Sequence, residues 1–355
     1  MKIRTRLLIV TSLFASILSP ATAQDETTPE SAAEKLPAAL PAKKLHTFNI
    51  YWENDGTILK RNNATDRHYT NGAGFNFAWQ PQWADSLAPY MPFADDFGPA
   101  RTAAGISIQH MIFTPDDITN PRIIRNDWPY VGYFATGLYW QRANENTMDH
   151  FQLDLGMIGP STQASELQKS IHEWRNIDKP QGWDHQQGDS FNVQAYLRKK
   201  WLVDIVGNPA DAENDGKFGI QVIPQLGVAL GTVFRRLEAD VTLRIGVNLP
   251  RDFGPGRLAD APAEMVEMPD GFFFYGYGRV GGRWVQHNKL LAGIDFRLDE
   301  KPWFGELQGG LATGYRKGNF SWSLTYSQTF LSDQFEGQSL PDAFGALALQ
   351  LQWEY

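Results

Sequence analysis

The chain has 355 residues, contains no cysteine and carries a formal net charge of −8 at pH 7. The lack of cysteine excludes disulfides as a source of stability, and no basic patch with interleaved aromatic residues indicates binding to nucleic acid. The mean hydropathy of −0.38 fits a secreted soluble protein. It also fits a transmembrane barrel, because alternating lipid-facing and lumen-facing residues average out as polar.

Residues 1–23 have the features of a secretory signal peptide. Three basic residues lie within the first six, an apolar stretch follows at 7–18, and Ala21-Thr22-Ala23 forms a small-residue cleavage site. The apolar stretch is too short to span a bilayer, so we expect export. Cleavage removes three basic and no acidic residues, which takes the net charge from −8 to −11. Residues 24–45, rich in Pro, Ala and Glu, are expected to form a flexible lead-in.

From residue 46 onward, apolar and polar side chains alternate with a period of two in many segments. From Leu237 to Leu249 every odd position is Leu, Ala, Val or Ile, and the positions between them are polar or Gly. Phe344 to Tyr355 ends on an aromatic residue, as do the terminal strands by which outer-membrane barrels are recognised for assembly. After the signal peptide no apolar run approaches the roughly 20 residues of a transmembrane helix. These patterns favour a membrane barrel over the alternative, a soluble domain with amphipathic strands.

We therefore predict an all-β fold in which a single domain at 46–355 forms a 12-stranded antiparallel transmembrane β-barrel. The twelve Trp and twelve Tyr suit aromatic girdles at the two membrane interfaces. A thirteenth candidate at 290–298 alternates less well, and single-chain bacterial barrels have even strand numbers, so we assign it to a loop. The predicted strands are 46–55, 69–80, 104–114, 131–142, 148–157, 190–203, 219–232, 235–248, 271–286, 304–316, 319–330 and 344–355.

One outer connection contains the short α-helix that we predict for an extracellular loop. With both termini in the periplasm, the loops after odd-numbered strands face outward, and 158–189 is one of them. Ser165 to Gln168 resembles a capping box, and Leu167, Ile171 and Trp174 form an apolar stripe at helical spacing. We expect this stripe to pack onto the barrel and to bring His172 to the end of the first strand, at Asn54 and Asp55. The connections at 81–103, 204–218 and 249–270 are long for periplasmic turns.

Polar groups crowd the outer ends of the first two predicted strands. Glu53-Asn54-Asp55-Gly56 closes the first strand and Thr65 to Gly72 opens the second, although turn formers in both would also explain a plain hairpin. Asn54 and Asp55 offer hard oxygen ligands, which suit calcium better than a transition metal. A second polar cluster, Thr114 to Asp127, leaves the third strand. Its acids Asp116, Asp117 and Asp127 are expected to be solvated loop acids rather than ligands.

A histidine next to a carboxylate is a common arrangement for removing a proton from water. His172 lies beside the apolar stripe, and Asp178 follows just past the predicted helix end. No zinc motif and no Gly-x-Ser-x-Gly elbow offers another chemistry. The alternative for His172 is a solvated loop histidine, and this is what we expect for the remaining candidates, His68, His110, His150 and His185.

In these residues the chain resembles the outer-membrane lipid A 3'-O-deacylases, a family of calcium-dependent twelve-stranded barrels. The resemblance implies that His172 is the general base and Asp178 its orienting acid. It also implies that Asn54 and Asp55 hold calcium or the oxyanion and that Thr70 lines the site. Family members have Glu in place of Asp178 and a basic residue in the second outer loop. Arg122 or Arg125 could take that place against a lipid A phosphate, but no motif fixes which, so neither is assigned the role. The motifs that carry the resemblance are Glu53-Asn54-Asp55, Tyr69-Thr70 with Gly72, Ile112-Phe113-Thr114-Pro115, Ile158-Gly159-Pro160, and His172 with Asp178.

The resemblance implies an ester hydrolase of the bacterial outer membrane that removes the 3'-linked acyloxyacyl chain of lipopolysaccharide. We expect Ca2+ as the cofactor, lipid A of the outer leaflet as the partner, and a membrane-embedded monomer. Two alternatives stay open: a phospholipase-like esterase barrel, and a non-enzymatic channel or adhesin.

Overall fold

Long antiparallel strands make up most of the described structure. The computed structural model describes residues 44–56, 66–91, 97, 99–207, 218–258 and 260–355. The predicted signal peptide and nearly all of the predicted lead-in lie outside these residues. The strands are β1 (Leu45–Asn54), β2 (His68–Trp79), β3 (Arg101–Thr114), β4 (Val131–Ala143), β5 (Thr147–Ile158), β6 (Ser190–Trp201), β7 (Val203–Val206), β8 (Phe218–Gly231), β9 (Phe234–Val247), β10 (Gly271–Asn288), β11 (Trp303–Lys317), β12 (Phe320–Leu331) and β13 (Asp342–Glu354).

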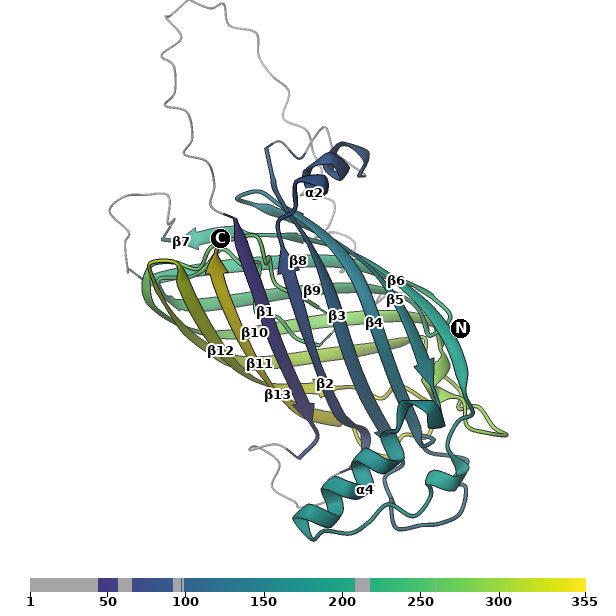
Figure 1. Ribbon diagram of the computed structural model, residues 1–355. Coiled ribbons are helices and arrows are strands. Elements are labelled where there is room, and N and C mark those ends of the chain that lie inside the picture. The colour runs from purple at the N-terminus through teal and green to yellow at the C-terminus, as the bar shows by residue number, and fades with distance from the viewer. Residues whose placement is uncertain (1–43, 57–65, 92–96, 98, 208–217, 259) are drawn as a thin grey trace, which may run out of the picture. The chain divides into compact units, whose positions relative to one another are not determined.

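The strands close into a twelve-stranded antiparallel barrel, as predicted (Figure 1). The first and last strands pair along their length, from Leu45 with Glu354 to Asn54 with Gly345. Strands β6 and β7 pair in succession with β8 and are separated only at Leu202, so they form one interrupted barrel strand. The predicted strand limits agree with the observed ones to within three residues. The segment 290–298 adds no strand to the sheet, which confirms its assignment to a loop.

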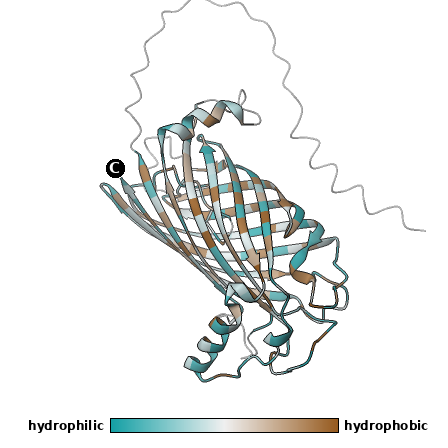
Figure 2. Cartoon of the chain, turned by 45° about the vertical axis from the view of Figure 1, so that its right-hand side comes forward, coloured by the Kyte–Doolittle hydropathy of each residue, from teal (hydrophilic) through white to brown (hydrophobic). Residues whose placement is uncertain are grey.

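The barrel is polar inside and apolar outside. Along β9 the buried side chains include Glu238, Asp240 and Arg244, whereas Val241 and Leu243 between them are exposed. Figure 2 shows apolar and polar residues alternating along the strands, with mostly polar colours over α4 and the loops at its end of the barrel. An exposed apolar face on every long strand is stable only against lipid. This surface is that of an outer-membrane barrel.

The connection between β9 and β10 folds back into the lumen instead of forming a periplasmic loop. Its residues 249–258 and 260–270, which we call the plug, contact inward side chains from several sides of the barrel. Asp260 lies 3.0 Å from Lys200 of β6 and Asp252 accepts from Arg244 of β9. The backbone carbonyl of Glu264 accepts from Thr47 of β1. This placement explains why the connection is so long.

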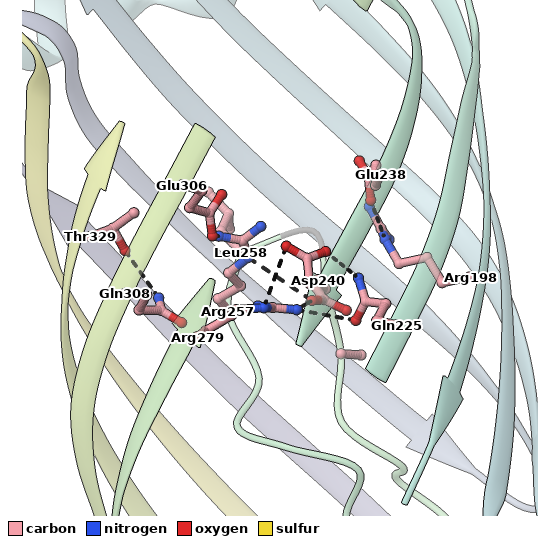
Figure 3. A network of polar contacts seen from close by, with 12 residues as sticks. Arg198, Gln225, Glu238, Asp240, Arg257, Leu258, Arg279, Glu306, Gln308 and Thr329 are labelled. Atoms are coloured by element: carbon pink, nitrogen blue, oxygen red, sulfur yellow. Dashed lines mark hydrogen bonds and ion pairs between the residues drawn. The ribbon is translucent and has the colours of Figure 1, made fainter. Parts of the chain in front are cut away.

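Charged side chains fill the space around the plug as paired ions (Figure 3). Arg198 lies 3.1 Å from Glu238 of β9, and Arg257 of the plug lies 2.6 Å from Glu306 of β11. A buried charge requires a partner because the lumen is shielded from water. One cavity between the plug and the wall measures about 20 Å³ and is lined by residues such as Tyr51, which leaves room for about one water molecule.

The chain enters and leaves the barrel at one end, where the backbone N–H of Tyr355 donates to the carbonyl of Lys44. The short helices α2 (Gln82–Leu87) and η1 (Ala88–Tyr90) lie at this end. The opposite end, which we call the rim, carries η2 (Pro160–Thr162), α4 (Ala164–Arg175), η3 (Trp183–His185) and η4 (Lys289–Leu291) (Figure 1). None of the helices in the described ranges is long and apolar enough to cross a membrane.

Candidate active site

Helix α4 confirms the helix predicted for the long loop, but it packs against the barrel with a different face. Its buried residues include Ser165, Gln168 and His172, whereas Leu167, Ile171 and Trp174 are exposed. The prediction that the apolar stripe packs onto the barrel was therefore wrong. The surface beneath the helix offers polar groups, so polar side chains of the helix pack against it. For example, Gln168 Oε1 accepts a hydrogen bond from the indole N–H of Trp183 at 2.7 Å.

The predicted capping box was also wrong. The helix begins after Gln163, which has a left-handed backbone and makes no side-chain cap, and Ser165 lies inside the helix.

The loop that carries α4 lies on the outer face of the barrel wall. Ile112 of β3 packs with Tyr130, Ala164 and Trp183, whereas its neighbour Phe113 belongs to a separate cluster inside the barrel. Successive residues of a strand point to opposite faces, so Ile112 and the loop are outside. The contact also needs a glycine on β4, because a Cβ at residue 132 would lie 2.0 Å from Thr162 Oγ1 and 2.5 Å from Ala164 Cβ.

His172 lies on the wall-facing side of α4 and has an acceptor at each ring nitrogen. Nδ1 is 2.5 Å from the backbone carbonyl of Asp178, and Nε2 is 3.0 Å from Asp66 Oδ2. Burial lowers the pKa of His172, but the hydrogen bonds to Asp66 and to the Asp178 carbonyl outweigh it and raise the pKa above its ordinary value of 6.5. Asp178 thus orients the imidazole through its main chain, and the carboxylate beside His172 belongs to Asp66.

The strand-end residues expected in the site lie together. Thr70 is the extra residue of a bulge, because the pairing of β2 with β3 shifts between Tyr69 and Asn71. Its carbonyl accepts from the Asn54 side chain at 2.9 Å and from the Asp55 backbone at 3.2 Å. The Asn54 oxygen in turn accepts from the Gly56 backbone at 2.8 Å.

Asp66 joins the strand ends to the helix. Its carboxylate contacts His172, its carbonyl accepts from Thr114 Oγ1 at 3.0 Å, and the next backbone N–H, that of Arg67, donates to Asp55 Oδ2 at 2.6 Å. Thr114 Oγ1 in turn lies 2.7 Å from Thr70 Oγ1. Asp66 has a φ of 70°, a conformation that few non-glycine residues adopt and that often marks a functional site. No periodic pattern in the sequence indicates the conformation of this segment, and the only hint at its role was the crowding of polar residues.

His68 holds this segment in place and is not the solvated loop histidine that we expected. It is buried, with Nδ1 2.7 Å from Asp342 and Nε2 2.7 Å from Asp127. Burial alone would raise the pKa of Asp127, but the hydrogen bond from His68 and two backbone donors lower it below its usual value. The expectation of a solvated Asp127 was therefore wrong as well, because its carboxylate fixes the second outer loop onto β2.

The remaining charged residues of the second outer loop are exposed. Asp116 lies 3.3 Å from Arg67, and Asp117 accepts from Thr119 of its own turn. Of the two candidate arginines, Arg125 pairs with Asp295 at 2.6 Å and Arg122 is exposed.

On the lumen side, the plug supports the same strand ends. Glu53 Oε2 accepts from the Tyr69 hydroxyl at 2.6 Å, and Oε1 accepts from the plug backbone at Leu258 at 3.2 Å. Glu53 precedes Asn54, and Tyr69 precedes Thr70. Glu53, the first residue of the Glu53-Asn54-Asp55 motif, is therefore held by Tyr69 of β2 on one side and by the plug on the other.

The oxygen atoms at the strand ends are of the type that calcium prefers as ligands. Asp55 offers a carboxylate, Asn54 an amide oxygen and Thr70 a hydroxyl, all of them hard oxygen ligands. Among the described residues, no group of three or more His, Cys, Asp and Glu side chains is arranged to hold a metal ion. A calcium site here would therefore include neutral oxygens beside the carboxylate.

Comparison with known proteins agrees with the barrel. LpxR from Salmonella typhimurium is 18% identical over 87% of this chain and 100% of that chain, with a TM-score of 0.66, which shows a shared fold. The translocator domain of autotransporter NalP from Neisseria meningitidis is 8% identical over 89% of this chain and 90% of that chain, with a TM-score of 0.46. No curated protein is significantly similar in sequence. Residues 7–353 match the model of the family described as outer membrane protein LpxR, so the chain belongs to this family of the outer membrane.

Proposed function

We propose that this protein is a calcium-dependent lipid A 3'-O-deacylase, an ester hydrolase that removes the 3'-linked acyloxyacyl chain of lipopolysaccharide. Membership of the LpxR family supports the reaction class. The observation that carries the proposal is the meeting of His172 with Asp66, beside Asp55 and Thr70, on the outer face of the barrel. These residues come from distant parts of the chain and assemble at one point of the rim.

His172 acts as the general base in this account. With its Nδ1 proton donated to the Asp178 carbonyl, the neutral ring has its lone pair on Nε2. The Asp66 carboxylate lies against that nitrogen in the structure, so it has to move aside before Nε2 takes a proton from the water whose oxygen attacks the ester carbonyl. Asp66 then stabilises the imidazolium that forms. The bond between the carbonyl carbon and the sugar oxygen breaks, and the proton passes from Nε2 to the departing oxygen.

The developing negative charge on the carbonyl oxygen needs a positive partner. Asp55 and Asn54 would hold the calcium ion, which when bound supplies Lewis-acid stabilisation of that oxygen. Thr70 lines the same proposed site, and its hydroxyl oxygen lies 2.7 Å from the hydroxyl oxygen of Thr114.

The position of the site supports a lipid substrate. It lies beside α4, whose loop packs on the outer face of the wall, so we expect a lipid to approach it from the side without entering the barrel. With the chain termini in the periplasm, the rim lies at the outer leaflet, where lipopolysaccharide resides. The plug and the paired charges in the lumen speak against the channel alternative.

The test is mass spectrometry of lipid A after incubation of lipopolysaccharide with the purified protein in detergent. We expect loss of the 3'-linked acyl groups with calcium and no loss with a chelator. His172→Ala should be inactive, whereas the matched control His185→Ala, which changes another histidine of the same loop, should retain activity. Unchanged lipid A with hydrolysed phospholipid would instead support the phospholipase-like esterase.

A further inference from the structure

The exposed apolar stripe of α4 has no partner within the described chain. Leu167, Ile171 and Trp174 are 42%, 38% and 84% exposed, and Ile177, just past the helix, is 37% exposed. At about 100° per residue the three helical positions fall within about 60° of one another. A cluster of large apolar side chains on one side of a surface helix usually marks an interaction site.

We propose that this stripe, Leu167, Ile171 and Trp174 with Ile177, is a membrane-docking surface that inserts into the acyl layer of the outer leaflet beside the barrel. The inference concerns how the rim contacts the membrane and does not depend on which ester the site hydrolyses.

The helix has three distinct sides. One side carries Gln168 and His172 and faces the barrel wall, and a second carries the apolar stripe. The third carries polar and charged residues that are exposed: Glu166, Lys169, Ser170 and Glu173. An apolar side next to a charged side is the pattern of a helix that lies in the plane of a membrane interface.

The stripe repeats the inversion seen in the barrel strands. From Leu237 to Val247 of β9 the exposed residues are apolar and the buried ones polar because lipid covers the outside. Helix α4 likewise buries His172 and exposes Trp174. The simplest common cause is that the same lipid phase covers both surfaces.

The base of the helix lies on the lipid-facing surface of the wall. Thr162 and Ala164 cover Gly132 of β4. Gly132 belongs to the same outward row of β4 as Phe134 and Leu138, which are 38% and 67% exposed. The helix therefore starts where the exposed apolar surface of the barrel strands reaches the rim. Because the stripe adjoins this surface, the acyl chains that cover the strands are the partner we expect for the stripe.

Docking would also bring the membrane to the reacting groups. His172 follows Ile171 directly and faces the wall, so insertion of the stripe fixes the depth of His172 relative to the leaflet. Ester bonds of membrane lipids lie at the boundary between headgroups and acyl chains, which is the depth reached by interfacial helices.

Site-specific labelling tests the proposal without reference to catalysis. The chain has no cysteine, so Trp174→Cys and Ile171→Cys each provide one attachment point for a polarity-sensitive fluorophore. Lys169→Cys and Ser170→Cys on the charged side are matched controls. Each protein is reconstituted into vesicles of phosphatidylethanolamine and phosphatidylglycerol, with and without a phospholipid that carries a nitroxide on its acyl chain. Circular dichroism confirms the fold of each variant.

We expect the labels at 174 and 171 to shift to the blue, to be quenched by the acyl-chain nitroxide and to be protected from aqueous iodide. The labels at 169 and 170 should show the opposite pattern. Equal iodide quenching at all four positions would overturn the proposal. So would protection at 174 that disappears when the protein is diluted in lipid, because this result would assign the stripe to contact with a second copy of the chain.

Discussion

His172 Nε2 lies 3.0 Å from Asp66 Oδ2, and this pair couples the loop helix to the strand ends. The pair predicts a specific pH dependence. A general base must be neutral, and the hydrogen bond to Asp66 helps to raise the pKa of His172 above 6.5. Activity should therefore rise with pH through a value above 6.5. In Asp66→Asn the carboxylate is lost while burial remains, so the pKa falls and the rise in kcat/KM moves to lower pH.

The measurement is the pH profile of kcat/KM for the parent and for Asp66→Asn. The matched control is Asp116→Asn, which changes an exposed acid of a neighbouring loop and should leave the profile in place. An unshifted profile in Asp66→Asn would show that Asp66 does not govern the ionisation of His172.

Asp178 contacts His172 through its backbone and not through its carboxylate, and a substitution can test this difference. Its backbone carbonyl accepts from His172 Nδ1, so Asp178→Asn should keep most of the activity and an unchanged pH profile. His172→Ala should lose about 10²–10⁴-fold of the rate, the usual contribution of a general base. A loss in Asp178→Asn comparable to that in His172→Ala would mean that the carboxylate itself orients the base.

The sequence predicted the strands but not the plug, and the difference has a physical cause. Alternation of the kind seen from Leu237 to Leu249 is enforced by lipid on one side and a polar lumen on the other, and it fixed all twelve barrel strands. The plug carries no such period, because its residues match partners from several strands, such as Lys200 and Thr47. Those partners are far away in sequence.

The candidate site divides in the same way. Asn54, Asp55, Thr70 and His172 were found through their motifs, and the structure brings them together. Asp66 and His68 were missed because backbone conformation and contacts between loops define their positions. The apolar stripe of α4 was correctly placed on one side of the helix, but periodicity cannot tell a face that packs on protein from a face that meets lipid.

Calcium binding should depend on the carboxylate of Asp55. Asp55→Asn removes one negative charge from the proposed ligand set, and calcium affinity follows ligand charge. We expect the dissociation constant, measured by calorimetry on the detergent-solubilised protein, to rise by about tenfold or more, which is about 1.4 kcal/mol. Asp117→Asn is the control in an exposed turn and should bind as the parent does. Equal affinity in all three proteins would remove Asp55 from the ligand set.

The plug predicts an electrically silent barrel. Asp260 pairs with both Lys200 and Arg279 at 3.0 Å, and loss of such a buried partner leaves uncompensated charges at a cost of about 3–5 kcal/mol. The parent should show no steady conductance in planar bilayers, whereas Asp260→Ala should show intermittent openings as the plug loosens. Asp333→Ala, which breaks the partly exposed pair with Lys301, should stay silent. Steady ion flow through the parent would favour the channel alternative.

The most direct test of the account presents both lipid classes to the protein at once. Lipopolysaccharide and glycerophospholipid are mixed in detergent with calcium, and the products of the parent and of His172→Ala are compared by mass spectrometry. We predict that the parent removes the 3'-linked acyl groups of lipid A and leaves the phospholipid intact, and that His172→Ala changes neither lipid. Intact lipid A in the parent reaction, or equal deacylation by His172→Ala, would contradict the account.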